Sequence, residues 1–149
     1  WSGNMYRTLY TYGMEDTIFM KIIRREVPAN IVYEDADTIA FLDVKPTALG
    51  HTLVIPKNPV QNIFDADDET LAAVMRTVRK ISPAVRDAVG AQGVHINSNH
   101  GAAAGQIVFH LHFHIIPRHD RSEFAFWPQH EYPKSDAAAL AEKIRQAIE

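Results

Sequence analysis

The sequence contains no cysteine among its 149 residues, so disulfide bonds and thiolate metal ligands are excluded. It also lacks a run of about 18 consecutive apolar residues, the length that a membrane-spanning helix needs. Neither sign of charge forms a long block, because 15 Lys and Arg residues are interspersed with 18 Asp and Glu residues, giving a net charge of −3. We therefore expect neither a membrane nor a nucleic acid as a partner. A cytoplasmic location agrees with the absence of cysteine, and we expect it on that basis.

The composition that is present is that of one globular domain. The chain is 46% hydrophobic and 22% charged, and it is long enough to bury one sizeable core. Residues 1–15 have no clear hydrophobic period, so we treat them as an N-terminal extension without a functional assignment. We expect residues 16–149 to form a single domain that ends in a tail and a helix over 135–149.

Hydrophobic periodicity predicts an α+β fold. Asp16 is a candidate N-cap for a short helix that ends before Pro28, and a second, amphipathic helix is expected over 67–89, kinked or divided at Pro83. Apolar and β-branched runs predict strands over 31–34, 38–44, 51–56, 94–98 and 107–116. Most connections are too short for crossover helices, so the predicted sheet is mainly antiparallel and covered by helices.

Three histidines alternate with apolar residues in the last predicted strand. His110, His112 and His114 would share one face, roughly 7 Å apart, while Leu111 and Phe113 anchor the other face in the core. Imidazoles near neutral pH can act as nucleophiles, proton donors or hydrogen-bond donors to phosphate. Two other interpretations stay open: one structural histidine with exposed neighbours, or a zinc site built on imidazole nitrogens.

A stretch of small residues precedes the histidines. Gly101, the alanines 102–104 and Gly105 are followed by Gln106. Small residues allow backbone amides to approach an anion closely, although such a stretch is by itself more often an ordinary turn. Its position directly before three histidines favours a phosphate site over a metal site.

These residues together resemble the signature of the histidine triad family, in its Hint branch. The resemblance rests first on Gly105 and Gln106 followed by the three histidines and by Pro117 and Arg118. It extends over residues 16–127, with further similar segments at 16–19, 22–23, 40–43 and 50–57. It implies an α+β fold with a five-stranded antiparallel sheet, a homodimer with one ten-stranded sheet and two nucleotide sites, and no cofactor or bound metal.

The resemblance also implies roles for individual residues. His112 is similar to the residue that attacks the α-phosphorus and forms a nucleotidyl-histidine intermediate. The other residues implied in catalysis, which contact or place the phosphate, are His110, His114, His51 and Gln106. Asp43 is similar to the carboxylate that accepts both ribose hydroxyls. The remaining nucleotide-binding residues implied are Ile18, Phe19, Ile22, Val27, Phe41, Asn99, Gly105 and Ile107, the last replacing the Ser or Thr of many Hint proteins.

Three functions follow from the sequence, and it leaves the choice between them open. The first is a hydrolase or transferase acting on purine nucleoside 5′-phosphoramidates or related AMP derivatives. The second, suggested by the Ile116-Pro117-Arg118 ending of the motif, is a Fhit-like hydrolase of diadenosine polyphosphates. The third is a non-catalytic module that binds nucleotides or serves as a scaffold.

Overall fold

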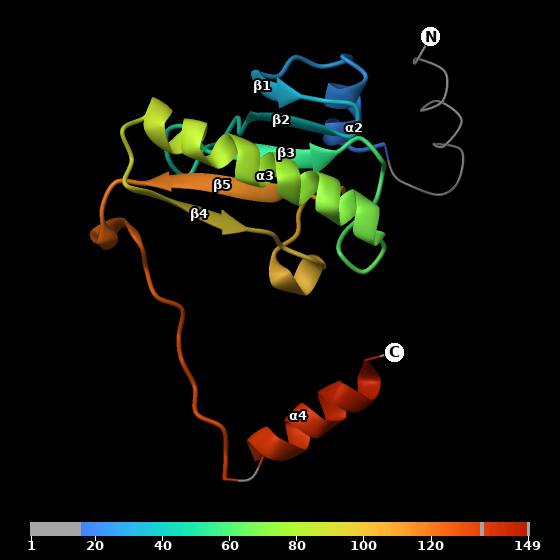
Figure 1. Ribbon diagram of the computed structural model, residues 1–149, viewed down its shortest axis with the longest axis vertical. Helices are drawn as coiled ribbons and strands as arrows, with labels where there is room; N and C mark the ends of the chain where they lie inside the picture. Colours follow the sequence, from blue (N-terminus) through green and yellow to red (C-terminus); the bar gives the residue numbers. More distant parts are fainter. Residues whose placement is uncertain (1–15, 135, 149) are drawn as a thin grey trace.

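The fold is built on one five-stranded antiparallel sheet (Figure 1). A computed structural model describes residues 16–134 and 136–148, so the expected extension at 1–15 lies outside the described residues. The strands lie in the order β1-β2-β3-β5-β4, and every neighbouring pair is antiparallel. Their bounds are Ile31–Glu34 (β1), Thr38–Leu42 (β2), Thr52–Pro56 (β3), Gly93–Asn97 (β4) and Phe113–Arg118 (β5). The predicted α+β class with an antiparallel sheet is confirmed.

Each face of the sheet packs against a different helix. On one face Ala40, Val54 and Ile115 pack against α3 (Asp68–Ala88) through Val74 and Val78. The opposite face carries the alternate strand residues, which pack against α2 (Ile18–Ile23). Its buried cluster comprises Phe19, Ile22, Ile39, Phe41, Leu53 and Ile55. Because successive side chains of a strand point to opposite faces of the sheet, the same strands contribute to both apolar layers.

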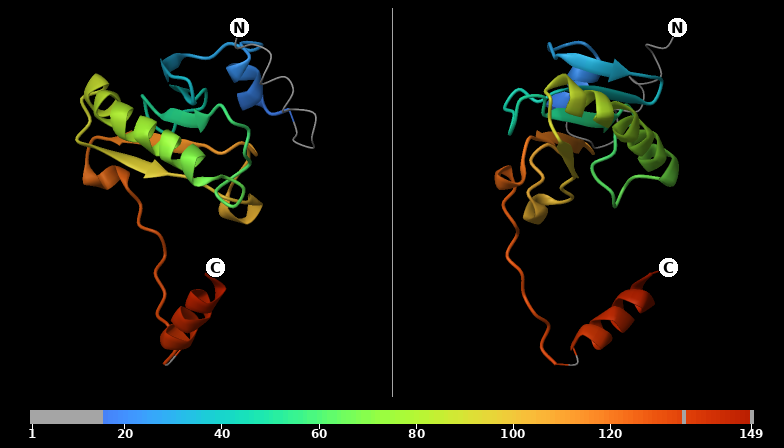
Figure 2. Two further views of the ribbon diagram at one scale, coloured as in Figure 1. Left: turned by 45° about the vertical axis from the view of Figure 1, so that its right-hand side comes forward. Right: turned by 60° about the vertical axis from the view of Figure 1, so that its left-hand side comes forward.

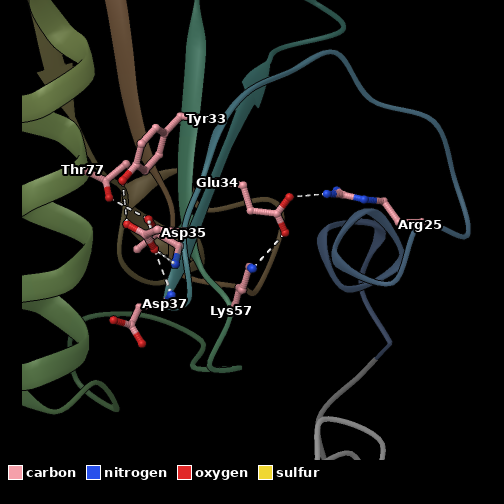
Figure 3. A network of polar contacts seen from close by, with 8 residues as sticks. Arg25, Tyr33, Glu34, Asp35, Asp37, Lys57 and Thr77 are labelled. Carbon is pink, nitrogen blue, oxygen red and sulfur yellow. Dashed lines mark hydrogen bonds and ion pairs between the residues drawn. The ribbon is translucent and has the colours of Figure 1, made fainter. Parts of the chain in front are cut away.

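The turn between β1 and β2 is fixed by Asp35 (Figure 3). Its carboxylate accepts hydrogen bonds from the backbone N–H groups of Asp37 and Thr38, at 2.9 and 2.7 Å. Thr38 in turn shares a buried 2.6 Å hydrogen bond with Thr77 of α3. At the end of β1, Glu34 pairs with Arg25 and, at 2.8 Å, with Lys57. The turn is therefore tied to the helix that covers the sheet.

The two helices that pack against the sheet, α2 and α3, each differ from the sequence prediction in one detail. The first helix is capped by Thr17, whose hydroxyl accepts from the N–H of Met20, whereas Asp16 binds Arg24 at 2.8 Å; the expected Asp16 cap is wrong. The helix α3 continues through Pro83, so the expected division there is wrong, and the alternative of a kink stays a prediction. Burial of the apolar face of α3 against the sheet offsets the backbone hydrogen bond that proline cannot donate.

The strand expected over 107–116 is the largest correction. β5 begins at Phe113, and its pairing with β3 covers only residues 113–115. Before it, the N–H of Leu111 donates to the carbonyl of Val60 at 2.8 Å, and the hydroxyl of Ser98 donates to the carbonyl of His112 at 2.7 Å. These bonds take the place of ladder bonds, so His110 and His112 lie in a segment without strand pairing that precedes β5, and residues 108–110 form a bend.

The C-terminal helix α4 (Asp136–Ala147) lies within the predicted range 135–149, whose end residues Ser135 and Glu149 are not described. Figures 1 and 2 show α4 apart from the sheet in every view, at the end of a tail that runs from a short 3-10 turn at Arg121–Glu123. None of its described residues is buried. Within the described residues, no helix combines the length and hydrophobicity needed to span a membrane.

Candidate active site

Four histidine rings meet on the α2 side of the sheet. His114 pairs with Leu53 of β3 and Asn97 of β4, so its side chain shares the face of the Leu53 layer. Its ring centroid lies 5.0 Å from that of His112 and 5.1 Å from that of His51. The expected group of His51, His112 and His114 is thus in contact, although the rings lie closer together than the spacing of a regular strand predicts.

The ring of His112 has one orientation and one tautomer fixed by the backbone. Its Nδ1 lies 2.7 Å from the carbonyl oxygen of His110, and because a carbonyl only accepts, Nδ1 carries the proton. The lone pair of the neutral ring is therefore on Nε2. The ring of Phe19 packs against it in a T-shaped arrangement, with a centroid distance of 5.0 Å and an interplanar angle of 84°.

His110 is completely buried and makes its contacts within the core. Its Nε2 donates to the carbonyl of Pro56 at 2.8 Å, and its Nδ1 lies 3.1 Å from the sulfur of Met20. Both ring nitrogens thus have partners inside the protein. The predicted phosphate contact of His110 stays a prediction, because both nitrogens of this buried ring already contact groups of the core.

A chain of hydrogen bonds links Thr47, His51 and His114. The N–H of Thr47 donates to Nδ1 of His51 at 3.0 Å, which leaves the proton of the neutral ring on Nε2. That Nε2 donates to Nδ1 of His114 at 2.9 Å, so His114 carries its own proton on Nε2. Each tautomer follows from the previous one, starting from a backbone amide that cannot change its role.

Burial keeps the four rings neutral at pH 7. It lowers the pKa of His114 to about 4, with smaller effects in the same direction from His112 and His51. It also lowers the pKa of His110 to about 4, against the hydrogen bond to Pro56. The pKa values of His112 and His51 are lowered by burial too, and the charge of Asp43 partly opposes this. A neutral imidazole has a free nitrogen lone pair, which a nucleophile requires.

Asp43 stands at the edge of this cluster, directly after β2. Its Oδ1 accepts from the N–H of Lys45 at 2.9 Å, and its Oδ2 lies 3.7 Å from Nε2 of His51. Its own N–H donates to the carbonyl of His51 at 2.9 Å. The carboxylate is one-fifth exposed, so lone pairs on both oxygens remain available to a ligand.

Gln106 organises the loop of small residues that precedes the histidines. Its side-chain oxygen accepts from the N–H of Gly101 at 2.8 Å, and its amide nitrogen donates to the carbonyls of Gln61 and Val108 at 2.7 and 3.2 Å. Gly105 has a φ of +90°, a region that favours glycine. The side chain of Gln106 is buried and engaged, so its predicted contact with phosphate stays a prediction.

The structure also offers a test of the zinc alternative. One oxygen of Asp43 and one nitrogen each of His51 and His114 lie within 4.8 Å of one another, close enough for a shared ion. Coordination through Nε2 of His51 requires this atom to be unprotonated. The N–H of Thr47 points at Nδ1, so Nε2 holds the ring proton. The hydrogen-bond pattern therefore favours a neutral donor chain over a metal centre at these residues.

Comparison with known proteins decides the family. The profile of the HIT domain matches residues 24–121. The chain belongs to the HIT domain family. Protein hit of Bacillus subtilis is 38% identical over 138 residues, which are 90% of this chain and 95% of that protein. Adenosine 5′-monophosphoramidase hnt1 of Schizosaccharomyces pombe is 35% identical over 134 residues, covering 88% and 97%. The crystal structure of SMU.412c from Streptococcus mutans has a TM-score of 0.86 at 39% identity and covers 94% of this chain and 90% of that one.

The remaining residues that the sequence predicts for the nucleotide site lie partly in the core of the HIT domain and partly on its surface. Phe19, Ile22 and Phe41 are buried in the α2-side core, and Val27 packs against them. Ile18 and Ile107 are exposed, at 48% and 88%. The side chain of Asn99 lies 3.5 Å from the carbonyl of Gly105 and thus belongs to the small-residue loop. Phe19, Ile22, Phe41 and Val27 therefore serve the core whether or not a base binds beside them.

Three residues of the HIT site were not identified from the sequence. Thr47 acts through its backbone N–H, for which the sequence has no signal. Met20 touches His110 from α2, and only the tertiary packing brings them together. Asn97 lies opposite His114 in the β4–β5 pair, and its buried side-chain oxygen has no hydrogen-bond partner among the described residues. Asn97 lies in the strand predicted over 94–98, and the alternation of side chains along that strand was the only sequence signal that could have pointed to it.

Proposed function

We propose that this HIT domain is a nucleotidyl hydrolase or transferase that acts on the α-phosphate of purine nucleoside 5′-phosphoramidates or related AMP derivatives, with His112 as the nucleophile. The hydrogen bond from Nδ1 of His112 to the carbonyl of His110 carries the proposal. It presents an unprotonated Nε2 on a ring whose pKa is lowered by burial. The name of the fission-yeast relative, an adenosine 5′-monophosphoramidase, supports the substrate class.

In the first step Nε2 of His112 forms a bond to the α-phosphorus while the bond from phosphorus to the leaving amine breaks. The amine departs with the electron pair and takes a proton from water. The phosphorylated ring then carries a positive charge, which the carbonyl of His110 stabilises by accepting from Nδ1. In the second step a water molecule attacks phosphorus and loses a proton to solvent. The ring departs neutral, and AMP is released.

In this proposal the phosphate oxygens accept hydrogen bonds from two groups of donors, one on His114 and one on the backbone before the histidine segment. His114 offers Nε2–H, because its Nδ1 accepts from His51. The backbone N–H groups of Ile107 and Val108, just before the histidine segment, have no acceptor among the described residues. Pre-placed donors of this kind stabilise the charge that develops on the oxygens of a phosphoryl group in transfer. In this proposal His51 acts as a positioning residue for His114.

The position of Asp43 indicates where the ribose and the purine ring of a nucleotide would bind. A carboxylate can accept hydrogen bonds from both ribose hydroxyls, and Asp43 is held at the cluster edge by Lys45 and His51. The exposed side chain of Ile18 on α2 and the half-buried Val27 provide apolar surface for a purine ring beside the α2-side core. The exposed Ile107 supplies no hydroxyl toward the leaving group.

A trapping experiment tests the proposal. Rapid quenching of a reaction with an adenosine phosphoramidate labelled at phosphorus should yield protein with covalently bound label, and His112→Asn protein should yield none. The same assay with a diadenosine polyphosphate distinguishes the Fhit-like function by its relative turnover. Tight AMP binding with no turnover of either substrate class would instead support a binding module and would refute the proposed enzyme.

A further inference from the structure

The segment 60–63, which lies between β3 and α3, is hydrogen-bonded along its whole length to residues 100–111. Figure 1 shows this part of the chain, in green, beside the short 3-10 turn at Ala102–Ala104. The bonds join Val60 to Leu111, Gln61 and Asn62 to Gln106, and Ile63 to His100, at 2.8, 2.7, 3.5 and 3.0 Å. The proposed function assigns roles to several residues of this set, but none to His100.

His100 makes its contact with the segment 60–63 through the imidazole ring. The N–H of Ile63 donates to Nδ1 of His100, so the proton of the neutral ring lies on Nε2. Burial lowers the pKa of His100, which keeps Nδ1 unprotonated and available as an acceptor. The ring also lies 6.4 Å from the ring of Phe113, measured between centroids. The half-buried His100 is therefore held between the segment 60–63 and β5.

His100 also fixes the start of the small-residue loop, which comprises residues 101–105. It directly precedes Gly101, whose N–H donates to the side-chain oxygen of Gln106 at 2.8 Å. The carbonyl of Gly101 accepts from the backbone N–H of Gln106 at 3.1 Å, so the two ends of the loop are bonded to each other. Because Gln106 also binds the carbonyl of Gln61, the closed loop is attached to the segment 60–63 at both ends.

The backbone donors that we propose for phosphate binding come directly after this loop. They are the N–H groups of Ile107 and Val108, and the carbonyl of Val108 accepts from the side chain of Gln106 at 3.2 Å. A shift of the loop would therefore move both donors relative to a phosphate held at His112. Misplacement by about 1 Å can lower a reaction rate by about 10²-fold, so the attachment of the loop matters for chemistry as well as for binding.

We propose that His100 is a positioning residue for the phosphate. By accepting the hydrogen bond from Ile63, it keeps the small-residue loop in the place where the N–H groups of Ile107 and Val108 meet phosphate oxygens. The ring of His100 itself does not touch the nucleotide. This proposal rests on the proposed function, because it requires a phosphate at these two amides. It is independent of the covalent step, so binding measurements decide it.

A comparison of AMP with adenosine tests the proposal, because the two ligands differ only in the phosphate. Calorimetry on the full chain should show that AMP binds more tightly than adenosine to the wild type. His100→Ala should weaken AMP by about fivefold to tenfold, the effect of one lost hydrogen bond, and leave adenosine within about twofold. His100→Asn should keep the wild-type ratio, because its Oδ1 can accept from Ile63 in place of Nδ1. His119→Ala is the control that removes an exposed histidine, and it should keep this ratio too.

Amide hydrogen exchange measures the contact itself. Exchange of the Ile63 N–H should be faster in His100→Ala than in the wild type or in His100→Asn. Equal losses of AMP and adenosine affinity would show that His100 only stabilises the fold. Equal impairment of the Asn and Ala variants would show that the imidazole meets the ligand directly. Either result, or AMP affinity that His100→Ala leaves unchanged, would overturn the proposal.

Turnover of an adenosine phosphoramidate by the same proteins tests the proposed function separately. A wild type that prefers AMP to adenosine but has no turnover would refute the enzyme, and the loss of this preference in His100→Ala would still support the positioning role. A wild type that binds AMP no more tightly than adenosine would show that the two amides hold no phosphate, and the positioning role would then be wrong.

Discussion

Nδ1 of His112 donates a 2.7 Å hydrogen bond to the carbonyl oxygen of His110, two residues earlier in the chain. This contact is local in sequence, and it forms in a segment that has no strand pairing, because β5 begins only at Phe113. The ring nitrogen that is left free is the one that the proposed chemistry uses. Four predictions follow from the site around it.

Replacement of His112 tests the nucleophile. His112→Ala should lower kcat by on the order of 10³ or more with an adenosine phosphoramidate, because no other unprotonated ring nitrogen is presented to phosphorus. AMP should still bind, since the ribose and base contacts remain, and calorimetry can measure this. His119→Ala, which removes an exposed histidine outside the cluster, should retain wild-type turnover. Near-normal kcat in His112→Ala would eliminate the covalent mechanism.

Asp43 tests the ribose contact. Asp43→Ala should weaken the binding of ribonucleotides by roughly 1 to 3 kcal/mol, the contribution of a pair of charge-assisted hydrogen bonds. The binding of 2′,3′-dideoxynucleotides should change much less, because they lack both hydroxyls. Asp65→Ala, which removes an exposed carboxylate elsewhere, should affect neither class. Equal losses for both classes would remove Asp43 from the ribose site.

His110 gives the folded protein a pH dependence with a defined sign. Burial lowers the pKa of His110 to about 4, below the value of about 6.5 expected in the unfolded chain. Between these values the unfolded state binds more protons, so the contribution of this ring to stability is complete above pH 6.5 and declines as the pH falls toward 4. The loss amounts to roughly 3 kcal/mol for a shift of this size.

Denaturant unfolding at a series of pH values measures this loss. His110→Gln provides the comparison, because its amide can donate to the carbonyl of Pro56 but does not titrate. The free energy of unfolding of the wild type should fall more steeply with decreasing pH, between 6.5 and 4, than that of the variant. Parallel curves for the two proteins would contradict the buried, neutral state of His110.

The fourth prediction concerns metal dependence. Because Nε2 of His51 holds the ring proton and the charge-stabilising groups are imidazoles and amides, phosphoramidate turnover should survive dialysis against a strong chelator. Activity and metal content would be measured on the same samples before and after treatment. Activity that disappears on dialysis and returns only with added zinc would assign a metal to the cluster of Asp43, His51 and His114.

The sequence by itself determined much of this protein. Apolar and β-branched runs identified the strands of the sheet, and the 3.6-residue spacing of apolar side chains identified α3, because both signals come from the residue types of one short segment. The alternation of His110, His112 and His114 with apolar residues located the candidate site and indicated the family. These features depend on residue type and spacing alone, and they are therefore readable without a structure.

The tertiary structure decided what each of these side chains does. The placement of His110 in the core, the tautomer of His114 and the engagement of Gln106 depend on Met20, Thr47 and Gln61, which lie far from them in the chain. The true start of β5 was set by competing hydrogen bonds from Leu111 and Ser98. Hydrogen-bond partners and burial arise from contacts between distant segments, so no local pattern in the sequence could specify them.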